Sequence, residues 1–259
     1  MFLAFIAGRI PQLRNAVRII STVGNPAVFM ITAAGFSIRA RDQLGLVAEL
    51  RLNRAACDTY LYQPMTLPNN YDYLFINLTP FRQFLELQAT DEDAVFIIHN
   101  LDLNQQRRWL TVHLLHPSAD RNYERYVKLE AISNQFHVPA MMVDETPYTV
   151  TATIQSLLFC NTVGRLRRSI DGNGHITDNL RPIWITLTVA SMRGDFYIQG
   201  AAAFGDIFRL WFDLTNLEAF IDAAQMSHNV LIHVEYPNRR PLLNCPFGNG
   251  LGNFFFFGN

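Results

Sequence analysis

The sequence is short of cysteine, of long apolar runs and of charge in excess of either sign. Its three cysteines are widely separated and odd in number, which argues against a disulfide framework and a thiolate zinc site. The longest apolar runs, such as 95–98 and 254–257, fall far below the roughly 20 residues of a membrane helix, and no charged-then-apolar leader opens the chain. A net charge of −1 argues against a protein that coats nucleic acid with its whole surface, but a local basic face stays open.

Sequence signatures of catalysis and of metal or cofactor binding are also missing. There is no HExxH motif, no GxSxG elbow, no Walker A loop and no convincing carboxylate pair. His113 and His116, three apart on a predicted strand, point to opposite faces. Segment 171–174 resembles the start of a calcium loop, but the twelfth position of that loop is Pro182 and not glutamate, so a turn is predicted there. The glycine-rich segment 248–252 is also predicted to be a turn. We therefore expect a scaffold rather than an enzyme, with no metal and no cofactor.

What the chain does contain is an internal duplication within 259 residues, 49% of them hydrophobic. The stretch 76–86 (INLTPFRQFLE) reappears at 212–222 (FDLTNLEAFID) with matching apolar positions. A second echo pairs 21–24 (STVG) with 161–164 (NTVG). We expect two similar domains, 1–132 and 133–259, joined by a linker at about 133–136.

Each echo predicts a helix. Thr79 and Thr215 are suitable N-caps, and Pro80 stands at the expected first helical position, where its missing N–H costs nothing. Gly24 and Gly164 are expected to close the other two helices in the left-handed conformation. Four short amphipathic helices are therefore predicted to begin near residues 10, 79, 149 and 215.

Between the helices, β-branched and aromatic runs broken by Gly, Asn and Pro predict antiparallel strands, so the fold class is α+β. The expected strands are 2–7, 28–32, 36–41, 44–52, 73–76, 94–99, 109–115 and 123–129, then 140–143, 183–189, 196–199, 207–212, 230–235 and 254–257. The four phenylalanines at 254–257 suggest a terminal strand buried on both faces. Segment 165–182 looks inserted, and 196–212 is too short for all the strands that a copy of the first half requires.

Several short sequences occur in an order that one known family shares. They are 1–4 (MFLA) opening a strand, Gly8 before the first helix, 35–42 (GFSIRARD), 46–50 (LVAEL), 58–60 (DTY) and 77–79 (NLT). In order and spacing they resemble the DNA sliding clamp family, typified by proliferating cell nuclear antigen, over nearly the whole chain and without one diagnostic motif. The resemblance implies the DNA clamp fold, with two similar domains that each carry two helices on antiparallel sheets and assemble into a pseudo-sixfold ring around duplex DNA.

Two segments look more like one branch of that family. Asn69 and Asn70 before Tyr73, and the stretch 136–143 (FHVPAMMV), resemble the Hus-type subunit of the heterotrimeric DNA-damage checkpoint clamp. That branch implies a nuclear protein with two other clamp subunits, an ATP-driven clamp loader, and repair or signalling proteins as partners. The alternative is a homotrimeric replication clamp that confers processivity on a polymerase. A third possibility is a β-rich binding protein without a ring, or an enzyme with an unrecognised site.

In the family the helices line the hole, so each should be apolar behind and basic in front, since phosphate neutralisation supplies affinity without sequence preference. Arg14 and Arg18 fit this, although a solvated amphipathic face is the plainer interpretation of surface arginines. The expected DNA-facing residues are Arg9, Arg14, Arg18, Arg82, Arg165, Arg167 and Arg168. Glu218 and Asp222 make the fourth helix acidic, which favours a heterotrimer whose partners supply positive charge.

The resemblance also implies two protein-binding surfaces. A groove for partner peptides with aromatic anchors would be formed by Leu44, Leu46, Ile132, Phe136, Pro241, Phe255, Phe256 and Phe257. Ring closure would pair an edge strand of one half with an edge strand of the neighbour's other half. The first-half interface candidates are Tyr123, Arg125, Val127 and Leu129.

Overall fold

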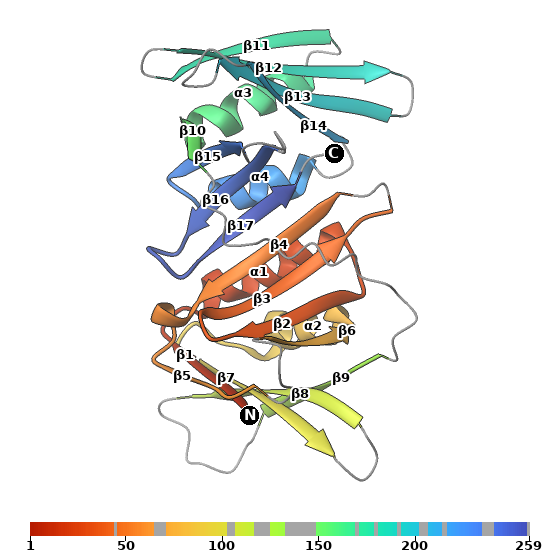
Figure 1. The fold of residues 1–259 in the computed structure, drawn as a ribbon, viewed down its shortest axis with the longest axis vertical. Coiled ribbons are helices and arrows are strands. Elements are labelled where there is room, and N and C mark those ends of the chain that lie inside the picture. Colours follow the sequence, from red (N-terminus) through yellow and green to blue (C-terminus); the bar gives the residue numbers. More distant parts are fainter. Residues whose placement is uncertain are drawn as a thin grey trace. The chain divides into compact units, whose positions relative to one another are not determined.

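The fold was analysed in a computed structural model of the chain, shown in Figure 1. The structure describes residues 1–43, 46–64, 71–102, 107–116, 125–132, 149–168, 171–178, 181–190, 193–201, 207–213, 217–234 and 241–257. Two compact units result, the first made of Met1–Arg41, Glu49–His137 and Gly248–Gly252, and the second of Asp42–Ala48, Val138–Phe247 and Asn253–Asn259. The linker predicted at 133–136 and the strand predicted at 140–143 lie outside the described residues.

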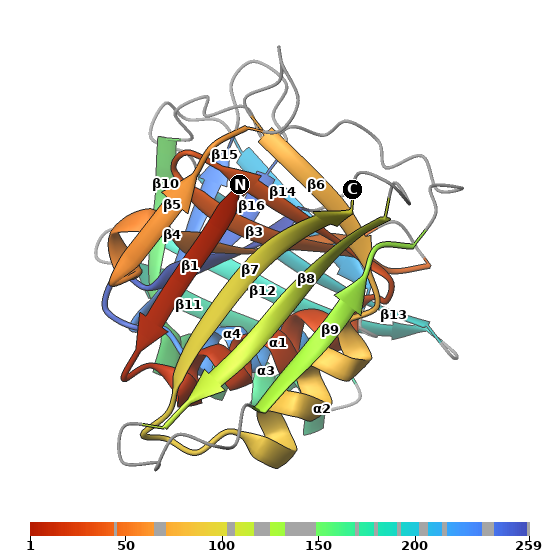
Figure 2. The ribbon, with the colours of Figure 1, turned by 90° about the horizontal axis from the view of Figure 1, so that it is seen from below.

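The first unit consists of two antiparallel sheets and two helices. One sheet has the order β5 (Thr59–Tyr62), β1 (Phe2–Ala7), β7 (Ala94–Asp102), β8 (Arg107–Leu115) and β9 (Arg125–Glu130). The other strands lie in the order β6 (Tyr71–Ile76), β2 (Ala27–Thr32), β3 (Gly35–Arg41) and β4 (Val47–Asn53), and a short 3-10 helix, η1 (Arg54–Ala56), follows β4. Helices α1 (Ile10–Val23) and α2 (Leu78–Gln88) pack against each other, and Figure 2 shows both behind the five-stranded sheet.

In the core of this unit, every second residue along a strand points inward and is buried. Phe2, Ala4 and Ile6 of β1 are buried, while the residues between them are partly exposed. The ring of Phe2 lies edge-on to Phe29 and Phe36, with centroids 6.1 and 5.9 Å away. Because these rings come from three strands, the core joins the two sheets.

Helix α1 confirms the predicted apolar stripe and its start at residue 10, but the predicted left-handed glycine is wrong. Ile10, Leu13 and Val17 are fully buried. Gly24 is extended, with φ −171° and ψ 153°. A Cβ on Gly24 would lie 2.2 Å from the carbonyl oxygen of Arg41, so close approach to β3, rather than a left-handed turn, requires glycine here.

Helix α2 begins at Leu78, two residues before the predicted first helical residue, because its cap is Asn77 and not Thr79. The Asn77 carboxamide oxygen accepts from the Thr79 backbone N–H at 2.9 Å. Asn25, 53 residues away from Leu78, accepts from the Leu78 N–H at 2.9 Å and so satisfies a second donor of the helix end. Pro80 is the third helical residue, not the first.

The second unit repeats this plan in element order. Four of its strands lie in the order β10 (Thr149–Gln155), β15 (Asn229–Val234), β16 (Pro241–Phe247) and β17 (Gly252–Phe257), which matches the order β1, β7, β8 and β9. Its second sheet has the order β11 (Asp171–Asp178), β12 (Arg181–Ala190), β13 (Arg193–Ala201) and β14 (Ile207–Asp213). Helices α3 (Ser156–Arg168) and α4 (Leu217–Gln225) follow β10 and β14, as α1 and α2 follow β1 and β6.

The third helix was predicted to begin near residue 149 and to close at Gly164, and both expectations are wrong. Residues 149–155 form β10, whose Gln155 pairs with Asn229 of β15. Their β-branched residues suit a strand better than a helix. Gly164 lies inside α3, and Arg165, Arg167 and Arg168 belong to the last turn of that helix.

Segment 165–182, predicted to be an insertion, instead carries the end of α3, all of β11 and the start of β12. The turn predicted at 171–174 is wrong, since these residues pair with 185–188 of β12. The predicted shortage of chain at 196–212 has a structural counterpart. Five residues separate Ala201 from Ile207, and β14 folds straight back onto β13, whereas β6 pairs with β2.

The terminal phenylalanines alternate instead of being buried on both faces. Phe254 and Phe256 are fully buried, and Phe256 packs edge-on to Phe220 of α4 with centroids 4.5 Å apart. Phe255 and Phe257 are half-buried on the opposite face of β17. This strand therefore has one face in the core and one partly exposed face.

Candidate DNA-facing and interaction surfaces

The arginines predicted to face DNA from α1 lie in three different settings. Arg9, immediately before the helix, donates from Nη1 to the carbonyl of Gly248 at 3.1 Å. Arg14 is half-buried with 27% of its side chain exposed. Arg18, one turn further on, is exposed on the polar side of the helix. Arg18 thus has the accessibility that contact with phosphate requires.

Arg14 ties α1 to the end of α2. Its Nε donates to the carbonyl of Leu85 at 3.1 Å, and its Nη2 donates to that of Ala89 at 2.8 Å. The same Nη2 lies 3.3 Å from a carboxylate oxygen of Asp91. Carbonyls at a helix C-terminus lack intrahelical donors and carry partial negative charge, so a guanidinium there caps α2.

The exposed sides of α1 and α2 are polar but nearly neutral. Arg82 of α2 lies 3.7 Å from Glu86, one turn away, which offsets its charge. The other exposed positions of these helices carry amides, a hydroxyl and one apolar residue: Asn15, Thr22, Gln83, Leu87 and Gln88. Positive charge on these two faces is therefore sparse.

In the second unit, the predicted DNA-facing arginines belong to α3. Arg165, Arg167 and Arg168 lie in the last turn of α3, and the structure describes their backbone only. At the start of α3, Leu157 is 73% exposed. On α4, Glu218 is exposed and Asp222 is half-buried.

The residues predicted for a partner-peptide groove are only partly described. Leu44 and Phe136 lie outside the described residues, and Pro241 is described as the first residue of β16 by its backbone only. Leu46 is buried in the fold, and so is Phe256. The accessible members of the set are Ile132, Phe255 and Phe257.

The structure brings together one pair of the groove residues. The rings of Phe255 and Phe257 lie side by side on β17, with centroids 6.5 Å apart. Ile132, which is 42% exposed, donates its backbone N–H to the carbonyl of Phe75 at 2.8 Å. The groove itself therefore stays a prediction.

The predicted interface strand lies at the margin of its sheet. Strand β9 pairs with β8 only, so its other edge has no partner strand among the described residues. Leu129 is buried beneath it and Val127 is half-buried, whereas Tyr123 lies outside the described residues. Arg125 does not reach away from the unit, because it donates to the carbonyl of Gln88 and to a carboxylate oxygen of Asp93, 2.6 Å away.

The open edge of β9 presents backbone donors at alternate residues. Arg108 and Ala131 continue the β8–β9 register, and the Ala131 N–H donates to the Arg108 carbonyl at 2.9 Å. Ladder hydrogen bonds alternate along an antiparallel pair, so odd-numbered residues of β9 bond to β8. The N–H groups of Tyr126, Lys128 and Glu130 therefore point to the open edge, where another strand could pair.

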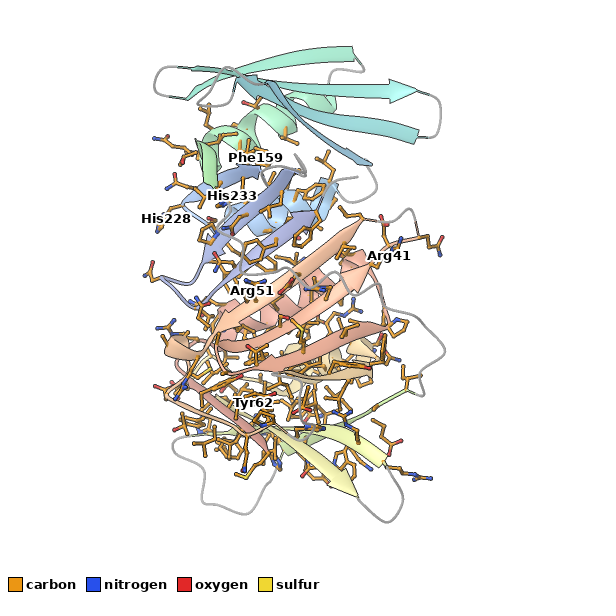
Figure 3. All side chains as sticks on the ribbon, viewed as in Figure 1. Arg41, Arg51, Tyr62, Phe159, His228 and His233 are labelled. Atoms are coloured by element: carbon orange, nitrogen blue, oxygen red, sulfur yellow. The ribbon has the colours of Figure 1, made fainter. Side chains whose placement is uncertain are left out.

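Sequence reasoning missed a buried ion triad on the first unit. The carboxylate of Glu49 on β4 is fully buried, 2.8 Å from Arg39 and 3.1 Å from Arg51, which is labelled in Figure 3. Two guanidinium groups compensate one carboxylate, so the charge can stay buried. The signal was a pair of opposite charges, Arg39 and Glu49, on the neighbouring strands β3 and β4.

A second missed residue is Asp93, which anchors the loop after α2. Burial opposes ionisation of its carboxylate, but hydrogen bonds from Arg125 and from the Thr90 backbone hold the pKa of Asp93 below its ordinary value. Asp93 is therefore a charged structural anchor beneath the edge strand.

The described residues show neither an activated cysteine nor a group of metal ligands. Burial raises the pKa of the Cys57 thiol to about 11, and it also raises the pKa of Cys160 and of Cys245, which disfavours the thiolate. Among the described residues, no group of His, Cys, Asp and Glu is arranged to hold a metal ion. Within the same ranges, no helix has the length and apolar character of a membrane span.

The sequence matches no family model and no curated protein. Among solved structures, the chain is similar to proliferating cell nuclear antigen from Thermococcus kodakaraensis, with a TM-score of 0.67 and 15% identity. The similarity covers 100% of this chain and 99% of that one. At this identity it establishes the fold alone, and it confirms the predicted class: the chain has the α+β fold of a DNA clamp.

Proposed function

We propose that this chain is one subunit of a ring-shaped DNA sliding clamp that encircles duplex DNA and tethers other proteins to it. The observation that carries the proposal is the similarity to a clamp structure over the full length of both chains. The repeated order of strand, helix, strands and helix in the two units supports it as well. The chain would act as a scaffold and not as an enzyme.

We further propose the Hus-type role, in which the chain forms a heterotrimer with two other clamp subunits in the nucleus. The support comes from the described side chains of α1, α2 and α4, where Glu86 offsets Arg82 and Glu218 is exposed. The arginines at the end of α3 are described by their backbone only and do not enter this comparison. A homotrimer would repeat this weak lining three times. A clamp loader would open the ring, and repair or signalling proteins would bind it.

The alternative is a homotrimeric replication clamp that supports repair and replication enzymes through processivity. One observation favours it, because a solved structure to which the chain is similar is named as proliferating cell nuclear antigen. The two roles differ in whether the chain closes a ring by itself.

Mass measurement in solution separates the two roles. A trimer formed by the chain alone supports the replication clamp, and a chain that forms a trimer only when mixed with two different clamp subunits supports the checkpoint role. A chain that forms neither contradicts the ring.

Contact with DNA is tested by retention on closed circular and linearised duplex. A ring stays on the circle and slides off the linear form. Arg18→Glu should reduce loading on the circle at low salt, and Arg54→Glu, an exposed arginine on η1, serves as the matched control. Equal loading of both variants would remove α1 from the DNA-facing surface.

A further inference from the structure

The side of the five-stranded sheet that faces away from α1 and α2 is apolar. The positions between the buried core residues point to this side, and they form what we call the outer face. Its apolar and aromatic members are Leu3, Phe5, Leu61, Phe96, Ile98, Trp109, His113, Leu115 and Tyr126. An antiparallel sheet with one solvated side normally alternates apolar and polar residues, and these strands do not.

The outer face is continuous across the strands. The register places Phe5, Phe96, His113 and Tyr126 in one row, with ring centroids 6.0 Å apart for the first two and 5.6 Å apart for the last two. A neighbouring row contains Leu61, Leu3 and Ile98. Figure 2 shows this side of the five strands in front of the helices.

Three of its apolar and aromatic side chains are open to solvent. Tyr126 is 56% exposed, Leu61 is 50% exposed and Leu115 is 48% exposed. Single exposed apolar residues are ordinary, but a contiguous patch of this kind marks an interaction surface.

Charge on the outer face is confined to one corner. Lys128 and Glu130 of β9 lie 2.8 Å apart there, and the Lys128 ammonium also sits 4.5 Å from the centre of the Trp109 ring. Arg107, at the start of β8, and Asp102, which lies opposite it in the β7–β8 register, are also at this corner. Among the described side chains, the remaining outward positions of the five strands carry no formal charge with which to select a charged partner or to repel an identical surface.

The outer face is large enough for a specific contact. Five strands about 4.8 Å apart, with four to nine residues that each rise about 3.3 Å, span roughly 24 by 13 to 30 Å. That area is on the order of 500 Å², so two such faces would bury about 1,000 Å², the lower bound for a specific interface.

We propose that the outer face binds the outer face of a second copy of this chain. Sheets stack well on sheets, about 10 Å apart and with their strands about 30° from parallel, and a second copy supplies a sheet face of the right size and neutrality. A two-fold contact lets each apolar row meet an apolar row, as isologous interfaces require. This contact uses the face of the sheet and leaves the β9 edge free, so it is independent of the proposed ring.

The test is the mass of the full chain in solution, measured by sedimentation up to about 1 mM. Wild type should double its mass with concentration, whether the starting species is a monomer or a ring. Leu61→Glu with Leu115→Glu should weaken doubling at least about 100-fold, because like charges then face each other across the contact. Leu87→Glu, the same change at an 82% exposed leucine of α2, should leave doubling intact.

A charge swap separates a broken interface from a broken fold. Leu61→Lys with Leu115→Lys should also fail to double by itself, but an equal mixture of the Glu and Lys variants should form mixed pairs. If the mass of the wild type never doubles with concentration, the proposal is wrong, and the outer face would bind a different protein. Doubling that survives the Glu variant, or variants that do not pair when mixed, would overturn it too.

Discussion

Two arginines one turn apart on α1 differ in what they can do. Arg14 donates to two carbonyls at the end of α2, whereas Arg18 is exposed. The spacing that placed both on one polar side could not separate them, because the carbonyls of Leu85 and Ala89 come from a distant segment. We therefore expect Arg14 to act chiefly in stability and Arg18 in surface contact.

Replacing Arg14 with Met should lower the free energy of unfolding by about 1–3 kcal/mol, since charge-assisted bonds to the end of α2 are lost while the apolar stem is kept. The same change at Arg18 should alter it by less than about 0.5 kcal/mol. Urea unfolding of both variants measures the difference. Equal losses would contradict the assigned roles.

His99 makes stability depend on pH. It is 5% exposed on β7, and neither ring nitrogen has a hydrogen-bond partner among the described residues. Burial, with a smaller contribution from Arg108, lowers the pKa of His99 to about 4. The folded protein therefore holds this imidazole neutral.

Between pH 6.5 and 4 the unfolded chain binds a proton at this histidine that the folded chain does not bind, so stability should fall as the pH falls. The loss should be about 2–4 kcal/mol. His99→Gln should flatten this part of the pH profile, measured by urea unfolding at each pH. A variant profile as steep as the wild-type profile would exclude His99 as the cause.

At the scale of elements, β9 is held firmly in its sheet, and one of its edges has no partner strand among the described residues. Arg125 holds it to Asp93 and to the end of α2, and Leu129 is buried beneath it. The N–H of Lys128 points away from β8, so proline there removes a donor of the open edge and no ladder bond.

Lys128→Pro should therefore abolish assembly with other clamp subunits and leave the unfolding midpoint nearly unchanged. Lys128→Thr, which loses the same side chain but keeps the N–H, should still assemble. Val127→Pro should instead lower the free energy of unfolding by about 1–3 kcal/mol, because it removes a ladder bond to β8. Mass measurement and thermal unfolding give the two readouts, and normal assembly of the Lys128→Pro variant would exclude this edge from the interface.

The two units differ in the pairing of the strand before their second helix, because the connection that leads to this strand is short in the second unit. Strand β6 reaches β2, but β14 turns back onto β13 after five residues. The duplication in the sequence predicted a copy of the first half, and the count of residues at 196–212 predicted that the copy would be incomplete. Which strand β14 would pair with was decided by the length of the connection.

At the scale of the whole molecule, the proposed ring would hold DNA more by enclosure than by charge. A duplex held by few phosphate contacts loses little affinity as salt rises. Adding positive charge to a helix that lines the hole should therefore add salt dependence that the wild type lacks.

Gln83→Arg with Leu87→Arg, both at exposed positions of α2, should tighten DNA retention about tenfold between 200 and 50 mM salt relative to wild type, as about two added phosphate contacts would. Arginines at exposed Thr59 and Gln63, outside the helices, are the control. Retention against salt measures the slope, and equal slopes for the two variants would place α2 away from the duplex.

The sequence by itself determined the duplication, the α+β class, the apolar stripe of α1 and most strands, because the periods of helices and strands are local properties. Tertiary structure decided the rest. Asn25 caps a helix that begins 53 residues later, Arg14 reaches a carbonyl 71 residues away, and Gly24 is needed only because Arg41 passes close by. These roles depend on contacts between segments distant in the chain, which no local pattern records.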